Sequence, residues 1–226
     1  MKIINPWTQD YHMHSTNFSD GTSSIDEMVK FAWEIWLTEI AITDHSDIAL
    51  KKWFNILWKQ WFACRWNLKR WKNIFNDVNV IFWVEWDLIN EKWDICSIIQ
   101  WIEQDFIILS AHIWVYEWDS ETITNWYVNA IKKHHDKIKF IGHPCNSRCF
   151  SKYVDIEKLI EVCNKYNIPM EFNATDFIKG NADIEMAHIM LKKANHIYVN
   201  SDSHSLYELK EHRKIAFDFL KDNKYI

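Results

Sequence analysis

The segment Asp10-Tyr11-His12-Met13-His14 decides the predicted fold of this chain. His12 and His14 are two residues apart, so on an extended strand both imidazoles lie on one face. The flanking residues 6–9 and 15–21 predict loops, which places the pair near a strand end where ligands can converge. This spacing fits a metal site, and it also fits two polar residues on a half-exposed strand. The rest of the chain decides between these two interpretations.

Composition limits the classes of protein that the chain can represent. The 226 residues contain no Pro/Gly/Ser-rich or charged linker, so we expect one domain over 1–226 with a sizeable core. The net charge of −5 gives no general signal for nucleic acid or anionic membranes. The N-terminus has no apolar signal-peptide core, and no apolar run reaches the roughly 18 residues that a membrane span needs. We therefore expect a cytoplasmic protein.

Tryptophan is unusually frequent and glycine unusually rare. The chain has 15 Trp and 3 Gly, whereas a globular domain of this length usually carries roughly 16 Gly. Trp36 follows a predicted helix where a left-handed residue is favoured, and Trp93 lies in a predicted turn. We hypothesise that many of these codons are UGA in a genetic code that reads UGA as glycine. The alternative is a protein that is genuinely rich in tryptophan.

Short β-branched runs alternate with helical patterns along the whole chain, which is typical of βα units on a parallel sheet. The predicted strands cover 8–14, 39–45, 80–88, 105–112, 138–143, 170–173 and 196–204. The predicted helices cover 24–35, 50–75, 96–103, 121–134, 155–166, 182–194 and 206–220. Seven strands, each followed by a helix, predict an α/β fold with a (β/α)-barrel rather than an open doubly wound sheet.

Metal-binding residue types recur at the ends of these predicted strands. They are His12, His14, His45, Glu85, His112, His143, Asp202 and His204, and Asp20 lies in the loop after the first strand. In barrels, the carboxyl ends of the strands meet at one mouth and carry the chemistry. A catalytic zinc needs only about three protein ligands, so nine donors imply two or three metal ions that Glu85 could bridge. Imidazoles and carboxylates without cysteine favour zinc, manganese or iron.

The chain resembles the PHP (polymerase and histidinol phosphatase) family of metal-dependent phosphoesterases. The motifs that carry the resemblance are 10–15 with 19–21, 43–45, 84–85, 110–112, 142–144 and 201–204, and the match runs from about Gln9 to Arg213. The resemblance implies a distorted (β/α)7 TIM-like barrel with a trinuclear metal site at the carboxyl ends of the strands. Trp83 and Trp86 flank Glu85 where the family usually has glycine or another small residue.

The resemblance also implies how the ligands are divided among the metals. The first metal would take His12, His14, Glu85 and Asp202, the second Glu85, His112 and His143, and the third Asp20, His45 and His204. Some family members have histidine at the position of Asp20.

The implied chemistry is attack of a metal-activated water on a phosphoester. The catalytic set is then Asp20, His45, Glu85 and Asp202, together with Arg148 as a contact to phosphate. Arg148 follows His143 on its loop, and it could equally be a solvated surface arginine. Arg213 and Lys152 are weaker candidates for a phosphate contact.

Three functional classes remain open. The favoured class is a phosphatase of small phosphomonoesters, with histidinol phosphate as the family-based expectation and nucleotide or sugar monophosphates as competitors. The second is a 5′–3′ exonuclease or nucleotide phosphatase acting on oligonucleotide ends, which the acidic balance and the lack of a basic tract disfavour. The third is a non-enzymatic accessory module, which would be expected to lack ligands. An amidohydrolase is disfavoured because the donors exceed a two-metal site. We expect substrate specificity to depend on the loops 46–70 and 113–120.

Overall fold

The protein contains a seven-stranded sheet at its centre. The computed structural model describes residues 1–53, 70–90, 92, 94–96, 98–99, 102–103, 106–113, 115–116, 119–148 and 153–226. Along the sheet the strands are β1 (Lys2–Ile3), β12 (His196–Asn200), β11 (Met170–Asn173), β10 (Ile138–Ile141), β9 (Ile107–Ser110), β5 (Val84–Leu88) and β6 (Ile95–Cys96). All neighbouring pairs are parallel except β5 and β6. The predicted α/β class is therefore confirmed.

A second sheet has three parallel strands, β2 (Gln9–Asp10), β3 (Glu39–Ile42) and β4 (Asn79–Phe82). Single bridges link the two sheets at Met13 with Ser203 and at His45 with Glu85. The strands that the structure describes form no closed sheet, so the predicted distorted (β/α)7 barrel is not confirmed. The predicted strand 80–88 is divided at Trp83, because β4 pairs with β3 whereas β5 pairs with β9.

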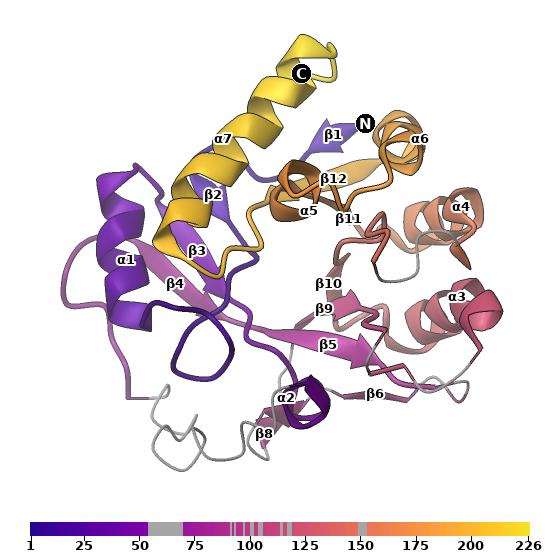
Figure 1. Ribbon diagram of the computed structural model, residues 1–226, viewed down its shortest axis with the longest axis horizontal. Helices are drawn as coiled ribbons and strands as arrows, with labels where there is room; N and C mark the ends of the chain where they lie inside the picture. The colour runs from indigo at the N-terminus through magenta and orange to yellow at the C-terminus, as the bar shows by residue number, and fades with distance from the viewer. Residues whose placement is uncertain are drawn as a thin grey trace.

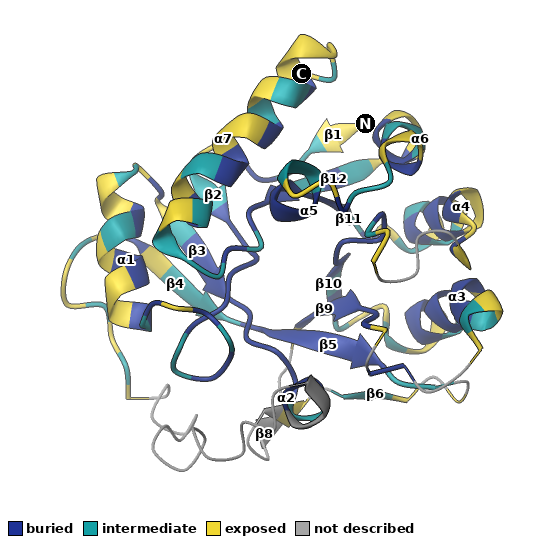
Figure 2. Cartoon of the chain, in the orientation of Figure 1, coloured by how far each residue is buried: buried dark blue, intermediate teal, exposed yellow. Residues whose placement is uncertain are grey.

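Helices surround the strands on the outside (Figure 1). The longer helices are α1 (Ile25–Glu34), α3 (Ile123–His134), α4 (Ile156–Tyr166), α6 (Ile184–Lys193) and α7 (Leu206–Asp222). Helix α1 begins at a capping box, in which Ser24 and Glu27 satisfy each other's backbone N–H groups. The helices bury their inward faces and expose their outward faces, as Figure 2 shows. Burial of one apolar face, rather than intrinsic helix propensity, therefore holds these helices in place.

Three apolar clusters hold the layers together. The largest lies between the seven-stranded sheet and helices α3, α4, α6 and α7, and a second packs α1 on the three-stranded sheet. A third cluster takes side chains from both sheets, and its buried members are Tyr11, Ala41, Trp83, Ile108 and Phe140. This inner cluster packs between the sheets. Each of its buried members comes a few residues before a predicted ligand in the sequence. The cluster leaves the strand ends available for polar side chains.

Two of the predicted helices differ from the structure. Of the residues expected to form a helix at 96–103, those that the structure describes lie in β6, β7 (Ile98–Ile99) and β8 (Ile102–Glu103), in keeping with their β-branched isoleucines. Of the predicted helix 50–75, the structure shows α2 (Asp47–Trp53) and a non-helical stretch at 70–75, and residues 54–69 lie outside the described residues. Strand β1 and the short helix α5 (Ala174–Ile178) were not predicted.

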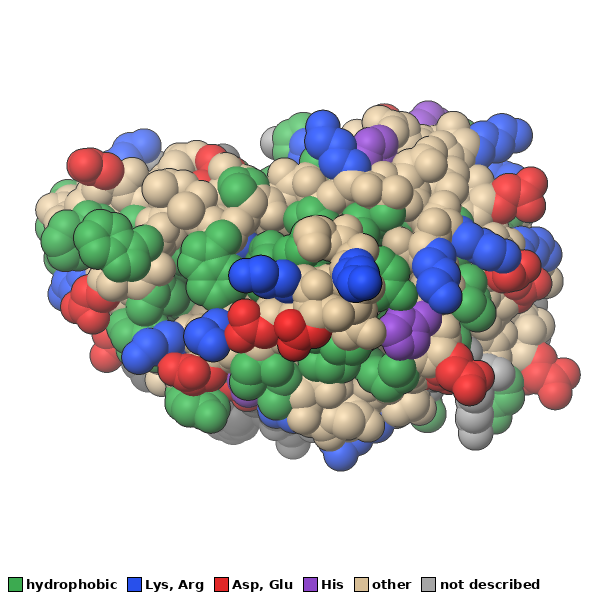
Figure 3. All heavy atoms as spheres, turned by 90° about the horizontal axis from the view of Figure 1, so that it is seen from above, with side chains coloured by type: hydrophobic (Ala, Val, Ile, Leu, Met, Phe, Trp, Pro, Cys, Tyr) green, Lys and Arg blue, Asp and Glu red, His purple; other side chains and the backbone are tan. Residues whose placement is uncertain are grey.

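The molecular surface is mixed in character. On the face seen in Figure 3, basic and acidic side chains are interspersed among apolar and uncharged groups. Among the helices that the structure describes, none is both long enough and apolar enough to cross a bilayer.

Trp36 and Trp86 bear on the hypothesis that UGA codons specify glycine. Trp36 follows α1 with φ 66°, in the left-handed region, and its side chain is 80% exposed. Trp86 is fully buried in β5, and its indole N–H makes no hydrogen bond. A left-handed residue after a helix is usually glycine, and a buried indole N–H normally has an acceptor. The left-handed backbone of Trp36 supports the hypothesis that UGA codons specify glycine here. Trp86 does not support it, because its indole fills part of the largest apolar cluster. Trp93, the other example, lies outside the described residues.

Replacing Trp36 with glycine should stabilise the protein. We expect Trp36→Gly to raise the free energy of unfolding by about 1 kcal/mol, because glycine has no Cβ to strain the left-handed backbone. Trp33→Gly makes the same change inside α1, where glycine is a poorer helix former than tryptophan. It should lower the free energy of unfolding by about 0.5 kcal/mol. Urea denaturation measures both, and equal destabilisation would argue against the left-handed requirement. The intact mass of the natively expressed protein tests the codon hypothesis itself, which a mass equal to the printed sequence would contradict.

Candidate metal centre

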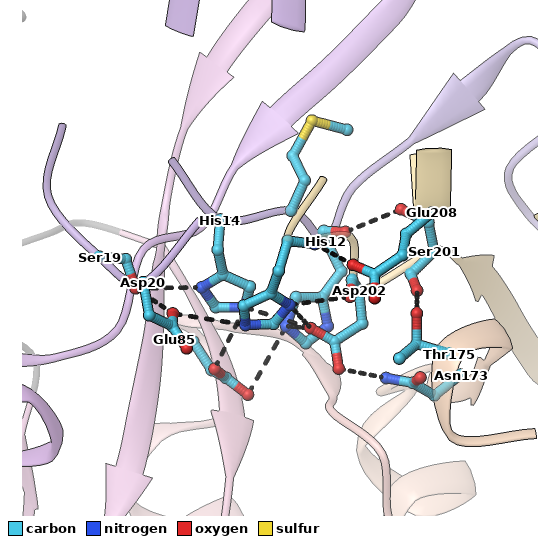
Figure 4. A network of polar contacts seen from close by, with 12 residues as sticks. His12, His14, Ser19, Asp20, Glu85, Asn173, Thr175, Ser201, Asp202 and Glu208 are labelled. Atoms are coloured by element: carbon cyan, nitrogen blue, oxygen red, sulfur yellow. Dashed lines mark hydrogen bonds and ion pairs between the residues drawn. The ribbon is translucent and has the colours of Figure 1, made fainter. Parts of the chain in front are cut away.

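The nine predicted ligands lie together at one end of the strands. His12 and His14 follow β2, and the other predicted ligands after a strand are His45 after β3, His112 after β9, His143 after β10, and Asp202 and His204 after β12. Glu85 differs from the prediction, because it lies near the start of β5 and not toward the end of a longer strand. Figure 4 shows His12 and His14 converging with Asp20, Glu85 and Asp202. Segments from both sheets therefore contribute to one polar centre.

Glu85 is the centre of this arrangement. Its carboxylate is 1% exposed and faces five imidazoles. The nearest nitrogens are His45 Nδ1 at 2.7 Å and His143 Nε2 at 2.8 Å. The Nε2 atoms of His12 and His112 lie 3.6 Å from a Glu85 oxygen, and Nε2 of His14 lies 3.7 Å from one. One buried carboxylate thus lies between imidazoles from segments of both sheets.

The donor atoms form three overlapping groups, each with its atoms within 4.8 Å of one another. The groups are His12, His14 and Asp202; His45, Glu85 and His112; and His14, Asp20, His45 and His204. These groups resemble the three expected ligand sets, with four differences. Glu85 is absent from the His12 group, and His143 is absent from the Glu85 group. His45 is shared with the Glu85 group, and His14 is shared with the Asp20 group. His143 reaches the centre through its contact with Glu85.

The chemistry of His12 tests whether the centre suits a metal ion. Its Nδ1 lies 2.8 Å from the carboxylate of Glu171, which as an ion can only accept, so Nδ1 carries the proton. The Nε2 lone pair is then buried, makes no hydrogen bond, and faces oxygens of Asp202 and Glu85 at 3.4 and 3.6 Å. A lone pair facing carboxylate oxygens requires a positive charge between them, which either a proton on Nε2 or a bound metal ion can supply. Nitrogen and oxygen donors of this kind suit Zn²⁺, Mn²⁺ or Fe²⁺, so the residues fit the implied metals.

Carboxylates and imidazoles strongly shift each other's titration. Burial lowers the pKa of His45, but Glu85 and Asp20 outweigh burial and raise that pKa to about 10. Burial likewise opposes the effect of Glu85 on His143, whose pKa rises to about 9. For Glu85, burial raises the pKa, and the surrounding imidazoles, His112 foremost, hold it well below its usual value. Protons and metal ions would compete for these nitrogens, so metal binding should release protons.

Backbone strain occurs at two of the candidate ligands. His143 has φ 29° and Asp202 has φ 51°, which are left-handed values that non-glycine residues rarely adopt. Gly142 precedes His143, and a Cβ there would lie 2.3 Å from Ser110 Oγ. Strained backbone of this kind is concentrated at functional sites, where the surrounding structure has to compensate for it.

A pocket of about 240 Å³ opens over the centre. It is lined by His45, Glu85, His112, His143, Asn146, Arg148, Thr175, Asp176, Lys179, Asn181, Asp202 and His204. Every lining side chain is polar or charged, and Arg148 and Lys179 are the cations among them. Arg148 lines the pocket and is also exposed, so its contact with phosphate stays a prediction. The pocket suits a small, charged ligand.

The other predicted phosphate contacts have different outcomes. Arg213 is buried and donates to the backbone carbonyls of Val199, Trp7 and Pro6. It lies near Asp10 and holds the N-terminal segment against β12. The prediction that Arg213 could contact phosphate is therefore wrong. Lys152 lies outside the described residues.

Sequence analysis missed three polar residues close to the ligands. Asp87 accepts a hydrogen bond of 2.6 Å from His112 Nδ1, which fixes the orientation of that imidazole. Glu171 and Asn173 on β11 contact other predicted ligands. Alternation could have located Asp87, because it lies two residues after Glu85 and so faces the same side of β5. Glu171 offered a weaker signal, an acidic residue inside a short apolar strand.

The chain has relatives among known proteins. The family model for the PHP domain matches residues 10–175. The DNA polymerase/3′-5′ exonuclease PolX of Bacillus subtilis is 27% identical over 209 residues, which cover 89% of this chain and 35% of PolX. A protein named "Probable phosphatase" from Shewanella piezotolerans is 26% identical over 213 residues, covering 91% of this chain and 81% of that protein.

Solved structures share the fold at 15% sequence identity. A Listeria monocytogenes protein described as a possible histidinol phosphatase hisK aligns with a TM-score of 0.57, over 92% of this chain and 99% of that one. The histidinol phosphate phosphatase of Lactococcus lactis, complexed with zinc, L-histidinol and phosphate, aligns with a TM-score of 0.51, over 92% and 93%. The family model covers most of the chain, and it includes seven of the nine predicted ligands, all except Asp202 and His204. The chain belongs to the PHP domain family.

Proposed function

We propose that the protein is a metal-dependent phosphatase that hydrolyses a small phosphomonoester with a metal-activated water. The observation that carries this proposal is the position of Glu85, one buried carboxylate facing five imidazoles at the base of a wholly polar pocket. Membership of the PHP domain family and the phosphatase names of several relatives support it. Divalent metal ions would supply a nucleophilic water near neutral pH and neutralise the phosphoryl oxygens.

The chain's own residues have distinct tasks in this reaction. The metal ions would be held by the nine candidate ligands, His12, His14, Asp20, His45, Glu85, His112, His143, Asp202 and His204. Arg148 would bind the phosphate, since a guanidinium can pair with two phosphoryl oxygens. Lys179 is held at the pocket by Glu208, whose other oxygen accepts from the backbone N–H of His204 at 2.7 Å. This linkage would place a second positive charge beside the metal centre.

Histidinol phosphate is the specific substrate that we propose first. The pocket volume fits a small phosphomonoester better than a polymer. The fold shared with the Lactococcus lactis phosphatase, which binds L-histidinol and phosphate, supports the same choice. The second candidate is hydrolysis of nucleotides or oligonucleotide ends. The match to PolX across 89% of this chain supports it, although PolX is named a 3′-5′ exonuclease and the direction predicted from the sequence is 5′–3′.

Steady-state kinetics distinguishes these candidates. The protein, reconstituted with Zn²⁺ or Mn²⁺, is assayed on L-histidinol phosphate, nucleoside monophosphates and a short 5′-phosphorylated oligonucleotide. We expect the highest kcat/KM on histidinol phosphate and loss of that activity in His143→Ala. A preference for the oligonucleotide would support the second candidate, and metal-loaded protein inactive on all three would contradict a phosphatase of these classes.

Arg148 provides a more specific test of the phosphate site. We expect Arg148→Ala to raise KM by about tenfold or more, because a charge-assisted contact to phosphate is lost. Arg70→Ala removes an exposed arginine that does not line the pocket, and it should leave KM unchanged. Equal KM values in the two variants would show that Arg148 does not contact the phosphate.

A further inference from the structure

Strand β11 carries none of the nine predicted ligands, but it contains the most heavily hydrogen-bonded carboxylate of the centre. Glu171 accepts from His12 Nδ1 at 2.8 Å and from Asn200 Nδ2 at 2.9 Å on one oxygen. Its other oxygen accepts from the His143 backbone N–H at 2.9 Å and from Asn173 Nδ2 at 3.1 Å. Both oxygens are therefore fully used, and two of the four donors belong to candidate ligands.

The contact with His12 determines which nitrogen of that imidazole is available. Because Glu171 accepts from Nδ1, the lone pair is on Nε2, the atom that faces Asp202 and Glu85. Metal-binding histidines commonly have a carboxylate partner of this kind on the opposite nitrogen. His12 and Glu171 are both buried, so bulk solvent does not compete for this hydrogen bond.

The contact with His143 acts on the backbone. The left-handed φ of His143 is unfavourable for a residue with a Cβ. Glu171 holds the N–H of this residue, while His143 Nε2 reaches Glu85 on the other side. Asn173, also on β11, donates to Asp202 Oδ2 at 3.0 Å, as Figure 4 shows, and Asp202 is the second strained candidate ligand. Side chains of β11 thus contact three candidate ligands, His12, His143 and Asp202, although none of the nine candidate ligands lies on β11.

We propose that Glu171 is a positioning residue, which sets the His12 tautomer and holds the His143 backbone so that both residues can bind metal. This proposal rests on the proposed metal-dependent function. Its experiment, however, measures metal binding directly.

Glu171→Gln tests the proposal because an amide cannot replace both oxygens. If the amide nitrogen faces His12, it donates to Nδ1 and moves the imidazole proton to Nε2, where it blocks metal binding. If the nitrogen faces His143, two N–H donors oppose each other in a buried space. Either orientation should weaken metal binding by about 10- to 100-fold, the usual effect of losing an outer carboxylate partner.

The measurement is the affinity for Zn²⁺, by competition with a chromophoric chelator, together with kcat and KM of the loaded protein. Glu39→Gln is the matched control, since Glu39 accepts from Asn79 Nδ2 and the Tyr11 hydroxyl and contacts none of the nine candidate ligands. We expect wild-type affinity in Glu39→Gln and lowered affinity in Glu171→Gln, with kcat reduced more than KM is changed. Wild-type affinity in Glu171→Gln would overturn the proposal.

A second measurement does not depend on the folding of a variant. In ¹⁵N NMR of the zinc-loaded wild-type protein, His12 should show a protonated Nδ1 with the downfield proton shift of a hydrogen bond to a carboxylate. A His12 signal protonated at Nε2 would overturn the proposal. Weakened zinc binding in Glu171→Gln, alongside a wild-type protein that hydrolyses no phosphomonoester, would refute the proposed function and leave the positioning role intact.

Discussion

Glu85→Gln should lower kcat by at least about 100-fold, because Glu85 is itself placed to bind metal. Loss of a carboxylate that only orients a metal-binding histidine already costs up to about 100-fold. The substitution keeps the size of the side chain and removes the charge that faces five imidazoles. An amide cannot bridge two cations as a carboxylate does. We therefore expect the zinc or manganese content to fall together with kcat.

The metal content is measured by elemental analysis after dialysis, and kcat on the best substrate found. Glu39→Gln again makes the same chemical change away from the centre, and it should keep both metal content and kcat. Thermal unfolding of the two variants shows whether Glu85→Gln is folded. A folded Glu85→Gln protein with full metal content and wild-type kcat would refute the assignment of Glu85 as the bridging ligand.

Gly21→Ala should be the most destabilising single-methyl substitution at a glycine of this chain. A Cβ at Gly21 would lie 2.0 Å from the carbonyl oxygen of His14 and 2.9 Å from the carbonyl carbon of Ser15. Both neighbours are backbone atoms, which cannot rotate away as a side chain can. We expect a loss of about 3 kcal/mol in the free energy of unfolding, the upper end of the range for overpacking.

The same substitution should also weaken metal binding, since the loop must move away from His14 and would carry Asp20 with it. Gly180→Ala is the control. A Cβ there meets nothing within 4 Å, although φ is +68°, so the cost should be about 1 kcal/mol from backbone strain alone. Urea denaturation gives both values, and similar losses in the two variants would contradict a steric requirement at Gly21.

The positions of most of the candidate ligands, Glu85 excepted, were predictable because they depend on local geometry. Residues at the ends of parallel strands meet at one edge of a sheet, whatever the length of the strands or the closure of the sheet. That rule placed His45, His112 and His143 together although they are far apart in sequence. The helix at 24–35 was equally predictable from the sequence, because its capping box and its apolar face lie within a few residues of each other.

Features that depend on distant partners were not predictable. The division at Trp83 arises because β4 and β5 pair with different strands, which no pattern within 80–88 reveals. Residues 96–103 have an apolar spacing that a short helix or short strands can both satisfy, so only the antiparallel partners decide. Glu171 has a role only because His12 and His143 come to lie on either side of it.

The two bridges between the sheets have a mechanical consequence. Among the described residues, the sheets join at Met13 with Ser203 and at His45 with Glu85, next to the ligands. His12, His14 and His45 follow strands of the three-stranded sheet, whereas Glu85, His112, His143 and Asp202 belong to the seven-stranded one. Metal ions bound between these residues would cross-link the two sheets, so the metal centre that performs the chemistry would also hold the two sheets together.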